Sequence, residues 1–386
     1  MNLLCIINVL TNDRDIKMKR VLIGIILVGV LGACASNDVA QKTEIKAEVT
    51  EKNQETNGVV ITSENFIHAD SVRAYLKEIA FTGSVNKLRH LREVANTDNQ
   101  DVIRMNRDTL YTRIIIDAKE GATVTLPKYD GLQIVALLDE NHQQIKELNG
   151  EGTLKITKDM LSVGQHGYII VRTGFIAGLS DDEKMERAYA AQDGIAFTAK
   201  SNAPYVPSVK YDFSTMDAVK YDILRNFALN LPENFSVGDG AGLIGERDEE
   251  TAKVVVAIGW GFLPKSQAAY ASFTGYRERE VLTIKSPELK EKGFFSYTLY
   301  DDNGWIATND YAINSDDMIQ NKDGTYTVTF LASGEPVQKN DLNVVRTPRG
   351  KYWTAVLRSY NPVDPEANQK LIDGYARGFD KQLKIY

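Results

Sequence analysis

The segment from Lys19 to Cys34 constrains this chain more than any other feature, because it decides in which compartment the rest must fold. It opens with two basic residues, continues with an apolar run over residues 21–31, and ends in Gly-Ala-Cys. This order is typical of a bacterial export signal, and the run is shorter than the roughly 20 residues that a membrane span needs. We therefore expect residues 1–33 to be a signal peptide, with Met18 as the true start.

The end of this segment, Leu31-Gly32-Ala33-Cys34, resembles the lipobox of bacterial lipoproteins. In those proteins the cysteine is acylated and becomes the new N-terminus, so the resemblance implies a lipid on Cys34 that anchors the protein to a membrane. Ala35 follows instead of aspartate, which by the same resemblance favours the outer membrane, with the protein facing the periplasm. Residues 34–60 are mostly polar and contain no aromatic residue, and we expect a disordered tether there.

Composition narrows the classes of function. The chain of 386 residues has a net charge of −7, and without its first 33 residues, which carry four basic and two acidic side chains, the charge is −9. Nucleic-acid binding is disfavoured, because that function wants a basic face. Cys5 and Cys34 are the only cysteines, so the exported part can form no internal disulfide and no thiolate zinc site. The four histidines form no close pair, and we expect neither a metal site nor a cofactor.

Hydrophobic patterns predict a mainly β fold with accessory helices, in the α+β class. Apolar residues recur at helical spacing from Phe66 to Ile79 and stop before Gly83, which predicts a helix. Short β-branched runs separated by glycine, proline and aspartate then predict strands at 110–116, 122–126, 132–138 and 168–173. Capping-box patterns predict two further helices, one at Ser180 with Glu183 and one at Ser214 with Asp217.

The chain from Thr251 onward is expected to return to strands, and its last third to form an antiparallel sheet. Asn303-Gly304 and Asp323-Gly324 are turn signals, because both dipeptides tolerate positive φ. We place the domain junction at 275–280, which gives a first domain over 61–275, a second over 276–363, and a C-terminal helix over 364–386.

One glycine-rich motif, Gly240-Ala241-Gly242-Leu243-Ile244-Gly245, matches the dinucleotide-binding pattern GxGxxG. That pattern needs a strand before it and an apolar helix after it. Here a polar segment precedes the motif and charged residues follow it, so we interpret the Gly238–Gly245 stretch as a loop whose role the sequence does not reveal.

The stretch from Val102 to Tyr111 is the most informative for function, because it places arginine, asparagine, aspartate and tyrosine at the mouth of a predicted strand. Side chains along a strand alternate between its two faces. Arg107 and Tyr111 should therefore point to solvent or a cleft, whereas Asp108 should point to the core and need a partner there. An alternative is that Arg107 and Asp108 both serve one buried salt-bridge network between the domains.

Within this stretch, Asn106-Arg107-Asp108-Thr109-Leu110-Tyr111 resembles the signature of the domain-of-unknown-function family numbered 1254. The resemblance continues at His90 to Arg92, Arg172-Thr173, Gln192-Asp193, Gly259-Trp260-Gly261, Pro264 and Tyr270. It departs at Phe262, where the family more often has glycine. The segments 294–301 and 358–362 are similar to the partner family numbered 1214. The resemblance implies two β-rich domains packed together, the C-terminal one a jelly-roll-like antiparallel sandwich, and it implies no particular chemistry.

Two functions fit these observations. The first is a membrane-anchored periplasmic lipoprotein that binds a small polar or anionic ligand in a cleft between two β domains. The second is a hydrolase or lyase acting on a small polar periplasmic substrate, with His90 or Tyr111 transferring the proton. No nucleophile–base pair separates the two readings, so whether the chain is an enzyme stays open, as does its self-association. The candidate ligand-binding residues are His90, Arg104, Asn106, Arg107, Tyr111, Arg172 and Trp260.

Overall fold

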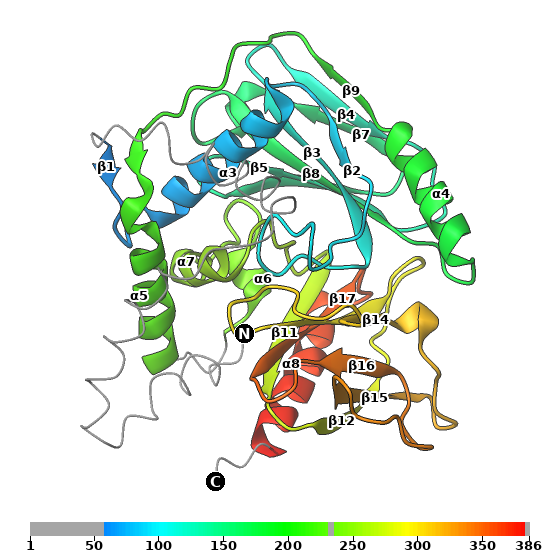
Figure 1. Cartoon of the computed structure of the whole chain (residues 1–386). Helices are drawn as coiled ribbons and strands as arrows, with labels where there is room; N and C mark the ends of the chain where they lie inside the picture. Colours follow the sequence, from blue (N-terminus) through cyan, green and yellow to red (C-terminus); the bar gives the residue numbers. More distant parts are fainter. Residues whose placement is uncertain (1–57, 231–234, 383–386) are drawn as a thin grey trace, which may run out of the picture.

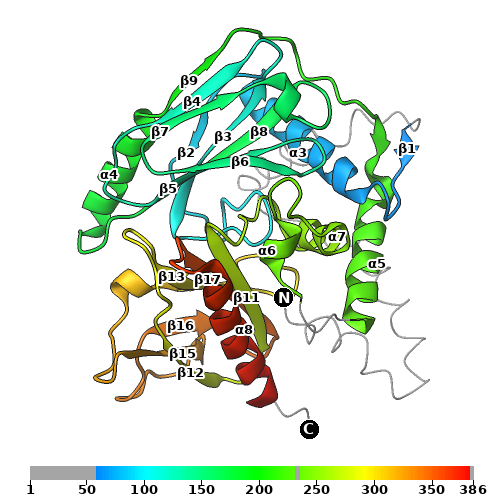
Figure 2. The same cartoon turned by 180° about the vertical axis from the view of Figure 1, so that it is seen from behind.

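The computed structural model describes residues 58–230 and 235–382, and it shows two β-rich units packed against each other (Figures 1 and 2). The predicted signal peptide, the predicted lipidation site Cys34 and nearly all of the predicted tether lie outside the described residues. No helix within the described ranges is long and apolar enough to cross a membrane. The expected mainly β fold with accessory helices is confirmed.

The first unit is a sandwich of two antiparallel sheets. One sheet has the order β2 (Arg89–Leu91), β3 (Thr109–Asp117), β8 (His166–Gly174), β5 (Gln133–Leu138) and β6 (Gln144–Asn149). The other has the order β7 (Gly152–Ile156), β4 (Ala122–Leu126) and β9 (Ala196–Ala199). Alternating apolar residues of the facing strands close the core between the sheets, among them Ile114, Ile116, Val124 and Val171.

Helices cover the opposite face of the larger sheet, where Ile115, Ile134 and Ile170 form a second core with them. These helices are α3 (Phe66–Thr82), α5 (Met216–Leu229), α6 (Val237–Gly240) and α7 (Glu249–Ile258), and a short parallel pair, β1 (Val59–Val60) with β10 (Tyr211–Asp212), lies beside them (Figure 1). Gly83 ends α3 in the left-handed conformation, as a C-terminal glycine does. The predicted capping box opens α4 (Asp181–Asp193), where Ser180 and Glu183 bond each other's backbone N–H.

The second unit is also a two-sheet sandwich. Its larger sheet is antiparallel, in the order β11 (Ala268–Gly275), β17 (Trp353–Tyr360), β13 (Phe295–Tyr300) and β14 (Ala312–Asn314). The smaller has the order β12 (Arg279–Lys285), β15 (Thr325–Ala332) and β16 (Val344–Thr347). Aromatic rings fill the core between them, with Phe273, Phe330 and Trp353 packed ring against ring. The C-terminal helix α8 (Pro365–Gln382) packs on β11, and the Asp364 side chain caps it.

Several details differ from the sequence predictions. The second unit begins at Ala268 and not at the 275–280 junction, because β11 pairs along its whole length with β17. The pair β15–β16 is parallel, so the smaller sheet is mixed. The chain after Thr251 continues in helix α7, whose run of valines fits a buried helix as well as a strand. Asp212, and not Ser214, caps the turn that leads into α5, and Val59–Val60 forms β1 instead of ending the tether.

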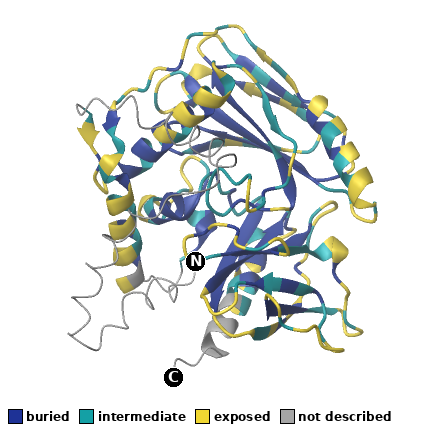
Figure 3. Ribbon diagram, in the orientation of Figure 1, coloured by how far each residue is buried: buried dark blue, intermediate teal, exposed yellow. Residues whose placement is uncertain are grey.

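A long loop of the first unit, residues 92–108, reaches across to the second unit. Ala95 and Met105 of this loop lie in the core of the second sandwich. The Gln100 side-chain amide forms two hydrogen bonds to the backbone of Ile306, and the Tyr300 hydroxyl donates to the Met105 carbonyl. In the burial map, buried strands of both units lie beside the 92–108 loop, which is itself mostly of intermediate exposure (Figure 3). The 92–108 loop is therefore a structural link between the units as well as one wall of the space between them.

Candidate functional site

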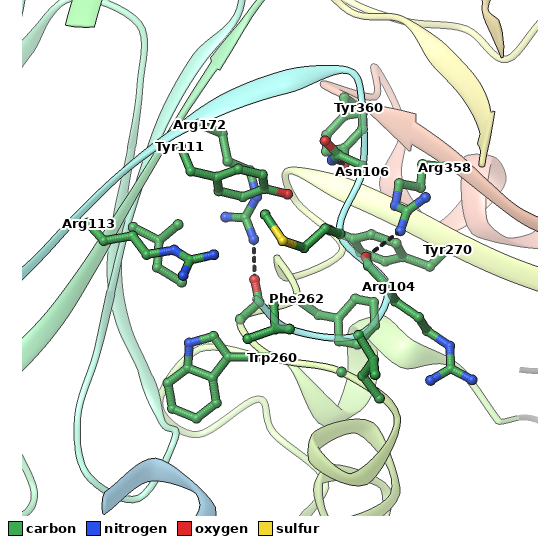
Figure 4. A pocket seen from close by; sticks show the side chains of 16 residues that line it. Arg104, Asn106, Tyr111, Arg113, Arg172, Trp260, Phe262, Tyr270, Arg358 and Tyr360 are labelled. Carbon is green, nitrogen blue, oxygen red and sulfur yellow. Dashed lines mark hydrogen bonds between the residues drawn. The ribbon is translucent and has the colours of Figure 1, made fainter. Parts of the chain in front are cut away.

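A pocket lies where the two units meet, with a cavity volume of about 40 Å³ (Figure 4). The first unit contributes β3, β8 and the 92–108 loop, and the second unit contributes β11 and β17, while the 259–262 turn connects α7 to β11. Since one buried water needs roughly 10–15 Å³, the cavity can take a small chemical group but not a whole cofactor. The lining residues are Val102, Ile103, Arg104, Met105, Asn106, Tyr111, Arg113, Ile170, Arg172, Gly259, Trp260, Gly261, Phe262, Tyr270, Arg358 and Tyr360.

Four arginines and no acidic residue are among the lining residues in the described parts of the chain. Arg113, Arg172 and Arg358 are each at most 5% exposed. The Arg104 side chain points away from Arg172 in Figure 4 and donates to the Ile258 carbonyl, so Arg104 faces the pocket mainly through its backbone. The pocket lining thus carries basic and no acidic side chains in a chain whose net charge is −7.

Arg172 and Arg358 come from different units and share one arrangement. Each uses Nη2 to hold backbone, since Arg172 donates to the Gly261 carbonyl and Arg358 donates to the Arg104 carbonyl at 2.9 Å. In each, Nη1 is buried and has no hydrogen-bond acceptor among the described residues. Neither guanidinium lies within 4.0 Å of a carboxylate in the described part of the chain. Both guanidinium groups therefore belong to residues that line the same small pocket, and each has one buried nitrogen without an acceptor.

Arg113 differs, because Asp101 already neutralises it. Its two terminal nitrogens donate to the two carboxylate oxygens at 2.8 and 3.2 Å. Burial opposes ionisation of Asp101, but the charge of Arg113 and its hydrogen bonds prevail and lower the pKa of that carboxyl. Arg89 contacts the same aspartate at 3.4 Å and pairs more closely with Glu78 of α3, at 2.6 and 2.7 Å. Arg113 thus belongs to an ion-pair network that fastens α3 and the 92–108 loop to β3.

The pocket wall beside Arg172 is fixed by His142. Its Nε2 accepts the Gly261 N–H at 3.2 Å, so the ring proton lies on Nδ1. Burial, together with the charge of Arg247, lowers the pKa of His142 to about 3, which keeps the ring neutral. The ring also packs edge-on against Trp260, with ring centres 4.1 Å apart. Because the Gly261 carbonyl accepts from Arg172, His142 helps to position that arginine through the Gly261 backbone.

Five of the seven predicted site residues meet in this pocket, namely Arg104, Asn106, Tyr111, Arg172 and Trp260. The Tyr111 ring lies near both Arg113 and Arg172, with its centre 5.6 and 5.7 Å from their guanidinium carbons. The Asn106 side chain donates to the Tyr360 hydroxyl at 2.7 Å and so links the 92–108 loop to β17.

His90 and Arg107 lie outside the pocket. His90 hydrogen-bonds Thr112 at 2.8 Å, on the face of β3 opposite Tyr111, and burial lowers its pKa. Arg107 is exposed, and its side chain forms no hydrogen bond or ion pair with any described residue. Arg107 thus points to solvent, one of the two predicted outcomes, and does not reach the pocket. Strand β3 begins only at Thr109, and Arg104 takes a left-handed backbone with φ 58°, so strand alternation does not extend to residue 107.

Asp108 is buried, as predicted, and its partners come from the second unit. One carboxylate oxygen accepts from the Ser296 hydroxyl at 2.5 Å, and the other accepts from the Asn314 side chain at 3.3 Å. Burial raises the pKa of Asp108 although the Ser296 hydrogen bond and the charge of Arg358 oppose that shift. Because Arg107 does not take part, the alternative of one buried network containing both residues is wrong.

Sequence reasoning missed the contributions of Arg113, Phe262, Tyr270, Arg358 and Tyr360 to this pocket. Alternation along β3 already placed Arg113 beside Tyr111, and that signal went unused. An arginine within the apolar run of β17 is a second available signal, because a fully buried arginine needs a reason. Within the described ranges, no group of three or more His, Cys, Asp or Glu side chains could hold a metal ion.

The glycine-rich motif does not form a dinucleotide loop. Helix α6, and not a strand, leads into it, and the Gly242 carbonyl accepts from the Gln143 side chain at 3.0 Å. Helix α7 follows, capped by Asp248. The motif therefore packs on the loop between β5 and β6.

Comparison with known proteins agrees with this architecture. Residues 85–199 match the family described as protein of unknown function DUF1254, and residues 268–364 match protein of unknown function DUF1214. No curated protein matches the chain.

Two crystal structures match the chain, and the first of them supports the fold. The VPA0106 protein of Vibrio parahaemolyticus superposes with a TM-score of 0.56 at 16% identity, over 78% of this chain and 93% of that one. An uncharacterised protein of Burkholderia cenocepacia gives a TM-score of 0.45 at 13% identity, over 86% of this chain and 88% of that one. With the matched families in this order, the chain belongs to the proteins that join a DUF1254 domain to a DUF1214 domain.

Proposed function

We propose that this protein is a membrane-anchored periplasmic lipoprotein that binds a small anionic ligand in the pocket between its two β domains. The observation that carries the proposal is the pair Arg172 and Arg358. Both are buried, neither lies within 4.0 Å of a carboxylate of the described residues, and each has one Nη1 lacking an acceptor. The charge of Asp108 acts on Arg358 without forming an ion pair with it. Removing a guanidinium from water is unfavourable unless an anion or several acceptors replace the hydration. A bound oxyanion supplies what the protein itself leaves out.

The arrangement suits a ligand better than a structural ion pair. Elsewhere in the same molecule, Arg89 and Arg113 are each matched to a carboxylate of the chain. The fold can thus neutralise a buried arginine, and at Arg172 and Arg358 it uses backbone carbonyls instead. Planar guanidinium forks bind carboxylates and other oxyanions with two parallel hydrogen bonds, and removal from water strengthens these bonds.

A hydrolase or lyase is the weaker reading. Such an enzyme commonly needs a group that takes up a proton near neutral pH. The lining holds no histidine and no carboxylate among the described residues. Burial raises the pKa of Tyr270 and of Tyr360, so both phenols stay protonated near neutral pH and cannot take up a proton there. Of the two residues considered for proton transfer, His90 lies outside the pocket and Tyr111 lines it.

The proposed location rests on the sequence alone. The order of basic residues, apolar run and Leu-Gly-Ala-Cys supports export and lipidation at Cys34, and Ala35 supports the outer membrane. A ligand-binding domain on such an anchor would meet small molecules of the periplasm.

Native mass spectrometry of the protein released gently from the periplasm tests the binding proposal. We expect the wild type to carry a small anion and the Arg172→Lys variant to lose it. Lysine keeps the charge but cannot hold Gly261 and a ligand with two separate arms. Arg107→Ala is the matched control, since it removes an exposed arginine outside the pocket and should leave the bound anion in place. Equal occupancy in wild type and Arg172→Lys would remove the basis of the proposal.

A further inference from the structure

We infer that the ligand is an amphipathic monocarboxylate with an aromatic or short aliphatic body, and that it enters the pocket carboxylate first. This inference rests on the proposed anion-binding function and names the class of anion. It follows from how charge and apolar surface are distributed with depth in the pocket.

The floor of the pocket is buried and the rim is partly exposed. Arg172, Arg358, Tyr270 and Tyr360 are each at most 5% exposed. The rim is formed by side chains of intermediate exposure, and these are chiefly apolar or aromatic: Val102, Ile103, Tyr111, Trp260 and Phe262. A ligand that fits both layers carries its charge at the inner end and apolar surface at the outer end.

At the inner end of the pocket, the two arginines offer nitrogens that lack a hydrogen-bond acceptor. Arg172 and Arg358 each present one buried Nη1 without an acceptor, which matches the two oxygens of a carboxylate. A phosphate would bring further oxygens into contact with the apolar side chains of Ile170 and Phe262, which offer no donor. Unpaired buried oxygens are costly, so the pocket should discriminate against phosphate.

The cavity volume of about 40 Å³ agrees with this reading. On the scale where one water needs roughly 10–15 Å³, the enclosed part has room for a carboxylate and little else. The remainder of the ligand must therefore lie along the rim.

Phe262 is the rim residue that should set the preference for an apolar body. Its ring packs edge-on against Tyr270, with ring centres 4.9 Å apart. A side-chain carbon on Gly259 would come within 2.7 Å of the Phe262 ring, so the turn leaves the ring little freedom to move. A fixed aromatic wall favours a flat or aliphatic partner over water.

Isothermal titration of the wild-type protein with four probes tests the inference: benzoate, acetate, benzamide and inorganic phosphate. We expect benzoate to bind roughly ten to a hundred times more tightly than acetate, because its phenyl ring loses contact with water when it lies along the apolar rim. Benzamide has the same shape without the charge, and it should bind at least about tenfold more weakly than benzoate. Phosphate should bind more weakly than benzoate as well.

The Phe262→Ala variant assigns the preference to the rim. It should lose most of the benzoate advantage and keep the acetate affinity, whereas Phe81→Ala, which removes an exposed phenylalanine of α3 outside the pocket, should change neither. Equal affinities for acetate and benzoate, or tightest binding of phosphate, would overturn the monocarboxylate inference and leave the anion proposal standing. Failure of acetate, benzoate and phosphate alike would overturn both. The wild-type series decides the matter even if the variant does not fold.

Discussion

Asp108→Ala should destabilise the protein far more than Arg107→Ala, although the two residues are neighbours in the chain. Asp108 is only 4% exposed and accepts hydrogen bonds from Ser296 and Asn314 of the other unit. Arg107 is exposed and forms no ion pair with the described residues. Comparing the two variants tests whether Asp108, and not its neighbour Arg107, stabilises the contact between the two units.

The expected loss of unfolding free energy for Asp108→Ala can be estimated from the groups that lose their partner. A hydrogen bond to a charged acceptor contributes roughly 1.5–3 kcal/mol, and leaving the Ser296 hydroxyl without its partner costs about 1–3 kcal/mol more. Arg358 also loses the nearest negative charge that acts on it. Against this, burial raises the pKa of Asp108, so the substitution removes a desolvation penalty. We therefore expect a loss of roughly 3–5 kcal/mol, nearer the lower value, and less than about 0.5 kcal/mol for Arg107→Ala.

Urea unfolding of the wild type and the two variants measures these differences. The midpoint should shift for Asp108→Ala with an unchanged slope, because the surface exposed on unfolding stays the same. Asp108→Asn keeps the size and can still accept from Ser296, so it should lose less than the alanine variant. Similar losses for Arg107→Ala and Asp108→Ala, or no loss for Asp108→Ala, would refute the reasoning.

Three further predictions concern the histidine behind the pocket, the domain pair and the anchor. His142 has a folded pKa of about 3 against an ordinary 6.5, so folding stability should fall as pH drops from 6.5 towards 3. Relative to His142→Gln, the wild type should lose about 1.4 kcal/mol of unfolding free energy per pH unit within that window. Urea unfolding at several pH values measures this loss, and parallel pH profiles of the two proteins would contradict the prediction. Calorimetry should show one coupled transition, because the 92–108 loop lies in the core of the second unit; two transitions, each unchanged by deletion of the other unit, would argue against coupling. Cys34→Ser should release the protein from the membrane fraction, whereas unchanged sedimentation would disprove lipid anchoring.

Local patterns along the chain predicted much of the fold. Helix α3, the capping box of α4 and strands β3, β4, β5 and β8 all follow from side-chain periodicity and capping chemistry. Helix α7 was missed because its valines fit a strand equally well, and only its packing against α5 and α6 decides. The position of β11 was missed because strand pairing with β17 joins residues that are 78 to 92 positions apart, which no local pattern reports.

The candidate site was predictable only in part, because some of its residues meet only when the two units pack together. The motif around Asn106 and Tyr111 marked one wall, and Arg172 and Trp260 came from the family resemblance. Arg358 reaches the pocket from β17, so its role depends on how the two units pack. The role of His142 could not be predicted either, because this residue contacts the pocket wall through the hydrogen bond that its ring accepts from the Gly261 N–H.

A double-mutant cycle on acetate affinity tests the central claim most directly, with Arg172→Lys, Arg358→Lys and the double variant compared by titration calorimetry. If one anion is held by both arginines across the two units, each single variant should weaken binding by roughly tenfold or more. The double variant should then lose much less than the product of the two single losses, because the arginines act on the same ligand. Independent, multiplicative losses, or single variants that bind acetate as the wild type does, would contradict the account.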